Sequence, residues 1–245
     1  MKIFSLFIAT AALNLSFSPG MAADLKVKIT PDIASVTVKH NGKDVTIQRD
    51  QNKDAKVIAA FAKTSRPCPP FCIQPAVLAP GVETIAEVEV LDYLKRMNGG
   101  DDSILVIDSR TPDWVKRGTI PGAINIPWTT LNISKSDPLT IVDTLEKHFN
   151  VKAQEDLYDF GNAKTLVMFC NGMWCGQSPN NIKSLLKIGY PAHKIKWYRG
   201  GMQDWELLGL STIPGSSSRH HRRCDRPPPG GLVCFSPSGT ANTAI

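Results

Sequence analysis

Short apolar runs and amphipathic segments alternate along the middle of the chain. The runs Ile104–Ile107, Leu166–Phe169 and Ile195–Tyr198 have the length and continuous apolar character of strands buried on both faces of a sheet. Apolar residues at helical spacing predict helices over residues 84–98, 139–149, 178–188 and 202–208. The first of these helices begins with a capping-box pattern at Thr84 and Glu87. Strands interleaved with helices predict an α/β fold, with a parallel sheet and helices on both of its faces.

An alternating pattern precedes this region. Residues 36–40 alternate between apolar and polar side chains, Asn41-Gly42 is a strong hairpin signal, and a second β-branched run follows. Residues 23–65 are therefore predicted to form a small N-terminal β-hairpin extension, with a short helical piece near residues 57–62.

The two ends of the chain differ in composition from its middle. Residues 1–22 hold one Lys, an apolar stretch and small residues before the cleavage position, which is the pattern of a secretory signal peptide. We therefore expect export to a bacterial periplasm, with full secretion as the alternative. No later stretch is long enough to insert into a membrane. Residues 215–245 switch to Gly, Ser, Pro and Arg, which predicts a disordered low-complexity tail.

The charge on the body of the protein is smaller than the formal value of +6. Lys2 would leave with the signal peptide, and the tail holds four Arg against one Asp, so about +2 remains. A balance this close to neutral gives no support for a nucleic-acid partner.

Six cysteines are grouped as two close pairs and a tail pair. Cys68 and Cys72 lie in residues 66–80, a segment that opens with four prolines in ten residues and is predicted to be an extended, rigid linker. This pair is a local disulfide, two unrelated thiols, or a redox pair that exchanges with Cys170 and Cys175. The spacing does not suit a zinc site, so no metal is expected. Redox or sulfur chemistry is favoured, because a chain of this length does not need disulfide staples.

Cys170 directly follows the apolar run Leu166–Phe169 and opens a glycine-broken loop. Ser178 and Pro179 then indicate a helix start, with a hydroxyl N-cap and proline at the first helical position. A thiol at a helix N-terminus is favoured as a thiolate, because backbone N–H groups and the helix dipole stabilise negative charge. The alternative is that Cys170 is a small buried apolar residue.

Four pieces of the sequence, in order, resemble the rhodanese family of sulfurtransferases. They are Ile104–Pro127, the strand that ends at Cys170, the passage from the loop to the helix, and Tyr198–Leu210. The resemblance covers residues 81–214 and implies one rhodanese-like domain, with a parallel sheet of about five strands between helices. It also implies that a Cys170 persulfide carries sulfur from a thiosulfate-like or persulfide donor to a thiophilic acceptor, without a cofactor. Small thiols and protein thiols are both candidate acceptors.

The resemblance also assigns roles to residues near the cysteine. The active-site loop is expected to cradle an anion with its backbone N–H groups. Its residues are Asn171, Gly172, Met173, Trp174, Gly176, Gln177 and Ser178. Asp108, Arg110 and Arg199 lie at strand ends. Arg110 is expected to pair with acids and brace the domain, whereas Arg199 either braces it or contacts substrate.

Three features depart from the family pattern. The passage from Cys170 to Ser178 is longer than usual, and Gln177 stands near where a basic residue is expected, which weakens the case for thiosulfate as the donor. Cys175 is a candidate resolving thiol or persulfide acceptor. Trp174 at the loop apex binds a partner, shields the persulfide, or packs as an ordinary buried aromatic residue.

Two other functions fit the same residues. A thiol–disulfide oxidoreductase or redox sensor would use Cys170/Cys175 and Cys68/Cys72 as its working pairs. A non-catalytic binding module would use the loop to dock a partner.

Overall fold

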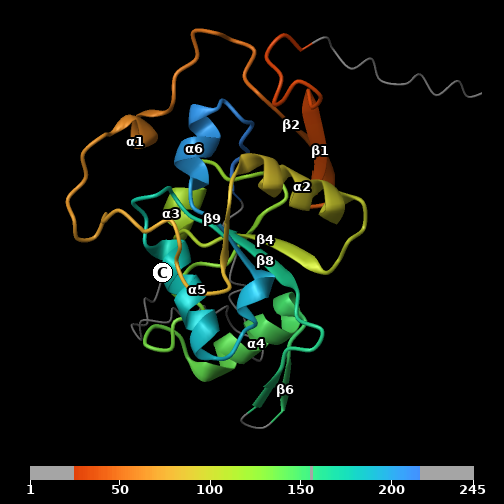
Figure 1. The fold of residues 1–245 in the computed structure, drawn as a ribbon, viewed down its shortest axis with the longest axis vertical. Coiled ribbons are helices and arrows are strands. Elements are labelled where there is room, and N and C mark those ends of the chain that lie inside the picture. The colour runs from red at the N-terminus through yellow and green to blue at the C-terminus, as the bar shows by residue number, and fades with distance from the viewer. Residues whose placement is uncertain (1–24, 155–156, 216–245) are drawn as a thin grey trace, which may run out of the picture.

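Five parallel strands form the centre of the molecule (Figure 1). The computed structural model describes residues 25–154 and 157–215. The strand order is β3–β9–β8–β4–β5, and every neighbouring pair runs parallel. The strands span Glu83–Ile85 (β3), Ile104–Asp108 (β4), Ile124–Asn125 (β5), Thr165–Phe169 (β8) and Ile195–Tyr198 (β9). The predicted parallel α/β fold is confirmed.

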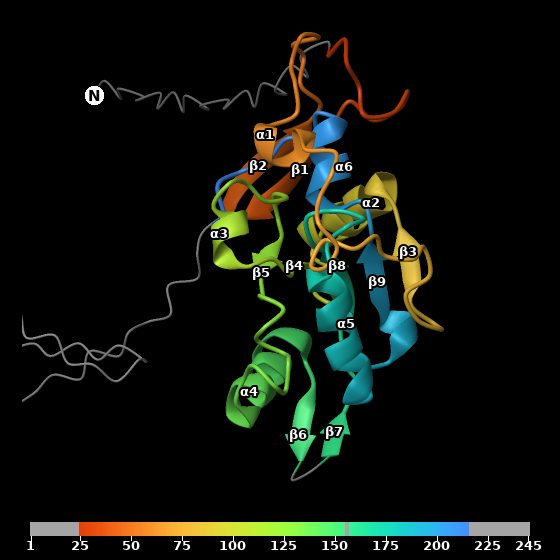
Figure 2. The same ribbon diagram turned by 90° about the vertical axis from the view of Figure 1, so that its left-hand side faces the viewer.

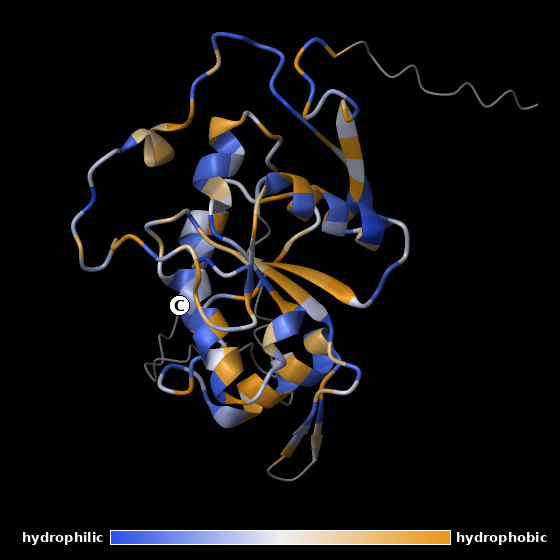
Figure 3. Ribbon diagram, in the orientation of Figure 1, coloured by the Kyte–Doolittle hydropathy of each residue, from blue (hydrophilic) through white to orange (hydrophobic). Residues whose placement is uncertain are grey.

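Helices cover both faces of this sheet, because its central strands are apolar on both sides (Figure 3). The helices span Ala59–Ala62 (α1), Glu87–Asn98 (α2), Pro112–Val115 (α3), Pro138–Phe149 (α4), Gln177–Lys187 (α5), Ala192–Lys194 (the 3-10 helix η1) and Gly201–Leu207 (α6). Val167 and Phe169 of β8 contribute to one core with α2 and α6, whereas Leu166 and Met168 contribute to the other with α4 and α5.

The predicted N-terminal hairpin is also confirmed. Strands β1 (Ser35–His40) and β2 (Lys43–Gln48) pair antiparallel and lie beside α2 in Figure 1. Asn41 and Gly42 take positive φ values of 50° and 77°, as a tight two-residue hairpin turn requires. A second antiparallel pair, β6 (Lys152–Gln154) and β7 (Leu157–Asp159), was not predicted.

The predicted capping box at Thr84 is wrong. Thr84 lies opposite Trp197 in the pairing of β3 with β9, so this segment is a strand. The helix begins at Glu87, and the carboxylate of Glu89 accepts a hydrogen bond of 3.0 Å from the backbone N–H of Ala86. The spacing of a capping box is therefore present at Ala86 and Glu89, two residues later than predicted. The shift also leaves Val88 48% exposed, although it was predicted to lie in the apolar stripe of the helix.

The ends of the chain lie outside the described residues. The predicted signal peptide, residues 1–22, and all of the predicted tail after residue 215 fall in this part, so both stay predictions. Among the described residues, no helix combines the length and apolar character needed to cross a bilayer. The linker, residues 66–80, contains turns but neither helix nor strand.

Candidate active site

Cys170 follows β8 directly, at the edge of the sheet where the carboxyl ends of the strands meet. In open α/β sheets this edge is the usual place for a ligand site. Asp108 ends β4 on one side of β8, and Arg199 follows β9 on the other side. The loop 171–176 then leads into α5, so three of the predicted site segments meet at this edge.

Ser178 does not cap α5 as predicted. The helix begins one residue earlier, at Gln177, with Gly176 at the N-cap, so Ser178 lies inside the first turn. Its buried hydroxyl instead donates a hydrogen bond of 3.1 Å to the Sγ of Cys170 and accepts one of 3.1 Å from the Nε1 of Trp197. The hydroxyl that was expected to satisfy a helix end therefore stabilises the candidate nucleophile.

Cys170 is only 2% exposed, yet its surroundings favour the thiolate. Burial raises the pKa of this thiol, but hydrogen bonds from the Cys175 thiol, the Ser178 hydroxyl, and the backbone N–H groups of Ser178 and Gly172 outweigh the burial and lower the pKa to about 7. At neutral pH roughly half of the Cys170 side chains therefore carry a negative charge. A buried apolar role alone does not account for the Ser178 hydroxyl, which donates a hydrogen bond to this sulfur.

Cys175 is the protonated partner of this sulfur. Burial and the neighbouring Cys170 both raise the pKa of Cys175 well above its ordinary value. The backbone N–H of Cys175 donates to the carbonyl of Gly172 at 2.9 Å, and the Cys170 thiol is 3.3 Å from the Cys175 carbonyl oxygen. The loop thus folds back on itself and brings together two free thiols, one with a lowered pKa and one with a raised pKa.

The start of α6 holds the loop in place. The N–H of Met202 donates to the carbonyl of Cys170 at 3.0 Å, and that of Gln203 donates to Asn171 at 2.9 Å. Gly201 has a φ of 56°, and a Cβ at this position would lie 2.4 Å from the carbonyl oxygen of Cys170. Only glycine allows α6 to approach the loop this closely.

Trp174 at the loop apex packs within a cluster of aromatic rings. Its ring centre is 6.3 Å from that of Trp114 and 5.6 Å from that of Phe71, and its indole N–H donates to the side chain of Gln203. Of the predicted options, this arrangement fits ordinary packing and shielding of the sulfur better than an exposed contact surface, because Trp174 is buried.

Asp108 and Arg110 form a buried ion pair with an N–O distance of 2.6 Å. Arg110 also donates to the carbonyl of Gly118 at 2.6 Å and lies 3.4 Å from the Oδ1 of Asn171 in the loop. The Thr119 hydroxyl donates a hydrogen bond of 2.7 Å to the carboxylate of Asp108. These contacts link the turn after β4 to the loop and leave the guanidinium of Arg110 fully buried.

Arg199 contacts the linker. Its guanidinium donates to the backbone carbonyl of Gln74 at 2.8 Å and to that of Pro75 at 3.2 Å. The N–H of Gln74 in turn donates to the carbonyl of Met173 at 2.8 Å, so the linker is hydrogen-bonded to the active-site loop. In Figures 1 and 2 the linker passes beside the N-terminal end of α5.

Cys68 and Cys72 are joined in a disulfide within this linker. They are thus neither free thiols nor metal ligands in this structure. The sequence predicted an extended, rigid linker but did not indicate a role for two of its side chains, Arg66 and Phe71, which lie against Trp174. No local pattern signals this contact, because it joins residues about a hundred positions apart in the chain.

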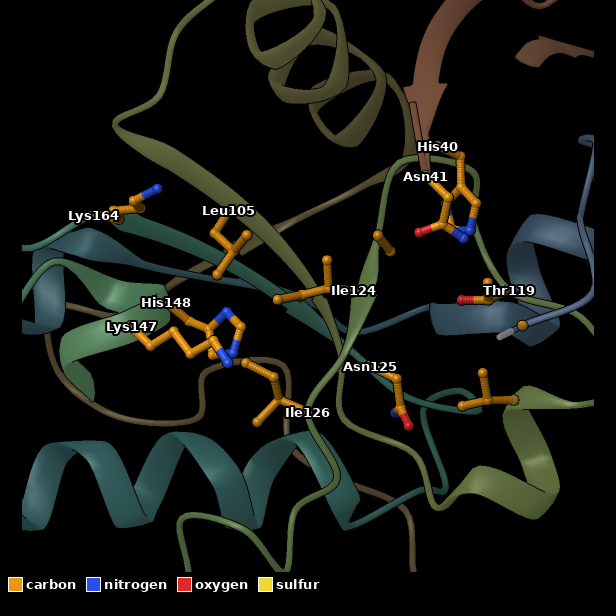
Figure 4. Close-up of a pocket in the computed structure, with 13 residues that line it drawn as sticks. His40, Asn41, Leu105, Thr119, Ile124, Asn125, Ile126, Lys147, His148 and Lys164 are labelled. Atoms are coloured by element: carbon orange, nitrogen blue, oxygen red, sulfur yellow. The ribbon is translucent and has the colours of Figure 1, made fainter. Parts of the chain in front are cut away.

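A separate pocket of about 360 Å³ opens beside β5, between the tip of the hairpin and α4 (Figure 4). His40 and Asn125 line one end of it, and Lys147 and His148 line the other. Burial lowers the pKa of both histidines. The described lining contains no cysteine, so this pocket is distinct from the sulfur site.

Comparison with known proteins finds a curated relative that matches part of this chain. A curated relative, an HTH-type transcriptional regulator of Mycobacterium tuberculosis, is 24% identical over 129 residues, which are 53% of this chain and 45% of the regulator. The chain thus matches less than half the length of that relative.

Several solved structures are similar as well. A thiosulfate sulfurtransferase from Pseudomonas aeruginosa is 20% identical over 55% of this chain and 20% of its own, with a TM-score of 0.36. A human single-domain sulfurtransferase is 19% identical over 51% of this chain and 96% of its own, with a TM-score of 0.33. A Rhodopseudomonas palustris protein of unknown function, described as a possible tyrosine phosphatase, is 18% identical over 56% of this chain and 88% of its own, with a TM-score of 0.39.

The family model of the rhodanese-like domain matches residues 90–208, the part of the chain that includes β4, β8, the Cys170 loop and α6. This part of the chain is therefore a rhodanese-like domain.

Proposed function

We propose that this protein is a sulfurtransferase that moves sulfane sulfur through a persulfide on Cys170. The observation that carries the proposal is the Cys170 thiol, whose pKa is lowered to about 7 at the end of the central strand of a rhodanese-like domain. A thiolate is the form that attacks sulfur, and few buried thiols are ionised at neutral pH.

The reaction has two steps that exchange one sulfur atom. With thiosulfate as donor, the Cys170 thiolate attacks the sulfane sulfur, a Cys–S bond forms, and sulfite leaves with the electrons of the broken S–S bond. A thiolate or cyanide then attacks the outer sulfur of the persulfide and releases the Cys170 thiolate. The N–H groups of Gly172 and Ser178 and the Ser178 hydroxyl stabilise the negative charge in both steps.

The candidate acceptors are small thiols, protein thiols and Cys175. As an acceptor, Cys175 would attack the outer sulfur of the persulfide and release the Cys170 thiolate. As a resolving thiol, it would attack the inner sulfur, release hydrosulfide and leave a Cys170–Cys175 disulfide. Its raised pKa keeps Cys175 protonated while Cys170 attacks, so the two thiols have separate roles.

A second candidate function is a thiol–disulfide oxidoreductase. It is favoured by the same adjacent thiols, because a thiolate next to a protonated thiol is the arrangement that opens a partner disulfide and then resolves the mixed disulfide. In that case Cys170 would attack first and Cys175 would resolve.

Mass spectrometry of the intact protein after incubation with thiosulfate tests the proposal. We expect a gain of about 32 Da, one sulfur atom, in the wild type and in Cys175→Ser, and no gain in Cys170→Ser. Peptide mapping should place the added sulfur on Cys170. A loss of two hydrogens in the wild type, with no added sulfur in Cys175→Ser either, would favour the oxidoreductase instead. No change in mass in any of the three proteins would favour a binding module.

We also propose that the protein acts after export to the periplasm. The pattern of residues 1–22 supports this location. N-terminal sequencing of the protein from a periplasmic extract should find a mature chain that begins near residue 23. A chain that retains Met1 in the cytoplasmic fraction would contradict it.

A further inference from the structure

The active-site loop has no cation of its own at the position where one is expected. Gln177 occupies that position, and its Oε1 is buried without a hydrogen-bond partner among the described residues. An anionic sulfur donor would meet the partly negative Cys170 there, so it needs a positive charge nearby. This charge would have to come from another segment of the chain.

Arg66 lies directly on the loop, although it comes from the linker and precedes the matched domain. Its guanidinium carbon is 3.9 Å from the ring centre of Trp174 and 5.8 Å from that of Phe71. Trp174 is the residue immediately before Cys175. Burial lowers the pKa of Arg66, and the electrostatic effect of Cys175 opposes this shift, as expected for a guanidinium close to the cysteine pair.

The hydrogen bonding of Arg66 is incomplete. One terminal nitrogen donates to the carbonyl of Ala60 at 2.5 Å, but the Nε is buried and has no partner among the described residues. No described carboxylate lies within ion-pair distance of this guanidinium. A buried charged donor without an acceptor is costly, and an anionic oxygen is the partner that best satisfies it.

The linker holds Arg66 in this place. The Cys68–Cys72 disulfide closes a small loop two residues after Arg66, and the N–H of Gln74 is bonded to Met173 of the active-site loop. Arg199 fixes the carbonyl of Gln74 from the other side. Figure 2 shows the same segment passing beside the start of α5. The guanidinium is therefore positioned before any ligand arrives.

We propose that Arg66 forms an oxyanion subsite beside Trp174, where its guanidinium binds the negatively charged group of the sulfur donor. This inference rests on the proposed sulfur transfer and deepens it, because it selects anionic donors over neutral ones. With thiosulfate, the sulfonate oxygens face Arg66 while the sulfane sulfur faces Cys170. The bond changes are those of the transfer itself, and Arg66 exchanges no proton.

Steady-state kinetics with two donors provide the first test. In Arg66→Gln we expect the KM for thiosulfate to rise about tenfold or more, while the KM for neutral diallyl trisulfide stays within about twofold of the wild type. Arg66→Lys should fall between the two, because it keeps the charge but loses the planar fork. The matched control is Arg117→Gln, since Arg117 stacks 4.3 Å above the neighbouring ring of Trp114. The proposal would be overturned if Arg66→Gln changed the KM equally for both donors, or if Arg66→Gln and Arg117→Gln had equal effects.

Alkylation of Cys170 gives a readout that does not depend on sulfur transfer. Iodoacetate and iodoacetamide are similar in size and differ in charge, so the ratio of their rate constants reports the positive potential at the sulfur. Arg66→Gln should lower the iodoacetate-to-iodoacetamide ratio about threefold or more, and Arg117→Gln should leave it unchanged. An unchanged ratio in Arg66→Gln means that the subsite does not exist. If the ratio falls but no persulfide forms in the wild type, the subsite stands and the proposed function fails.

Discussion

At the scale of single residues, the ionisation of Cys170 depends on neighbours that come from one helix and one loop. The pKa is lowered from the ordinary value of 9.0 to about 7, so the thiolate accumulates as the pH rises through 7. Ser178 supplies two of the hydrogen bonds responsible, one from its hydroxyl and one from its backbone N–H. The hydroxyl bond is the one that a substitution can remove.

Ser178→Ala should therefore raise the pKa of Cys170. We expect the midpoint of its alkylation profile with iodoacetamide to move upward from about pH 7, and the rate at pH 7 to fall about threefold or more. Ser184→Ala, a buried serine further along the same helix, serves as the control. A midpoint that is the same in both variants would remove Ser178 from the account of the thiolate.

Sequence reasoning at this scale succeeded where the signal is local. The position of Cys170 at the end of a buried strand follows from the apolar run before it, and the structure has it there. The role of Ser178 could not be predicted, because the same Ser-Pro pair fits both an N-cap and the first turn. Contacts with Cys170 and Trp197 decided between them.

At the scale of elements, the approach of α6 to the Cys170 loop depends on one glycine. Gly201→Ala would place a methyl group 2.4 Å from the carbonyl oxygen of Cys170, at a φ of 56°. We expect the free energy of unfolding to fall by at least about 2 kcal/mol more than in Gly42→Ala. Gly42 also has a positive φ, 77°, but has open space around its Cβ position, so the comparison separates steric contact from backbone strain.

Urea unfolding of the two variants measures this difference, and the alkylation midpoint of Cys170 reports whether the loop has moved. Equal losses of stability would mean that α6 shifts away from the loop without cost.

Elements with strong local signals were predicted, and those fixed by pairing were not. The Asn41-Gly42 turn defines its hairpin by local chemistry alone. Strand β3 has only three residues and exists because it pairs with β9, a contact between positions more than a hundred residues apart. The local pattern at Thr84 therefore favoured a helix start that the sheet overrides.

At the scale of the whole molecule, the linker before the matched domain lies against the Cys170 loop. Arg199 holds it through backbone carbonyl groups, so Arg199→Gln should loosen residues 66–80 without removing any group from the Cys170 loop. We expect faster hydrogen exchange across the linker, and a rise in the KM for thiosulfate of about threefold or more.

Arg49→Gln is the matched control for this prediction. Arg49 also donates to a backbone carbonyl, that of Leu208 at 2.8 Å, but does so away from the linker. Faster exchange in the linker of Arg49→Gln, or none in that of Arg199→Gln, would show that Arg199 is not what holds the linker.

The participation of the linker could not be predicted from the sequence. Its prolines indicate a rigid, extended segment but carry no information about the surface on which it lies. The resemblance began at residue 81 and the family match at residue 90, so neither included Arg66. Its position depends on the aromatic cluster, which gathers Phe71, Trp114 and Trp174 from three separate segments.

The burial of both thiols has a kinetic consequence. Because Cys170 and Cys175 are only 2% and 4% exposed, we expect a donor to reach sulfur only during excursions in which the segments that cover the two thiols move apart. The observed rate of modification should then rise with reagent concentration and level off at the frequency of these excursions, independent of the reagent used. That plateau would set an upper limit on turnover that no improvement in sulfur chemistry could exceed.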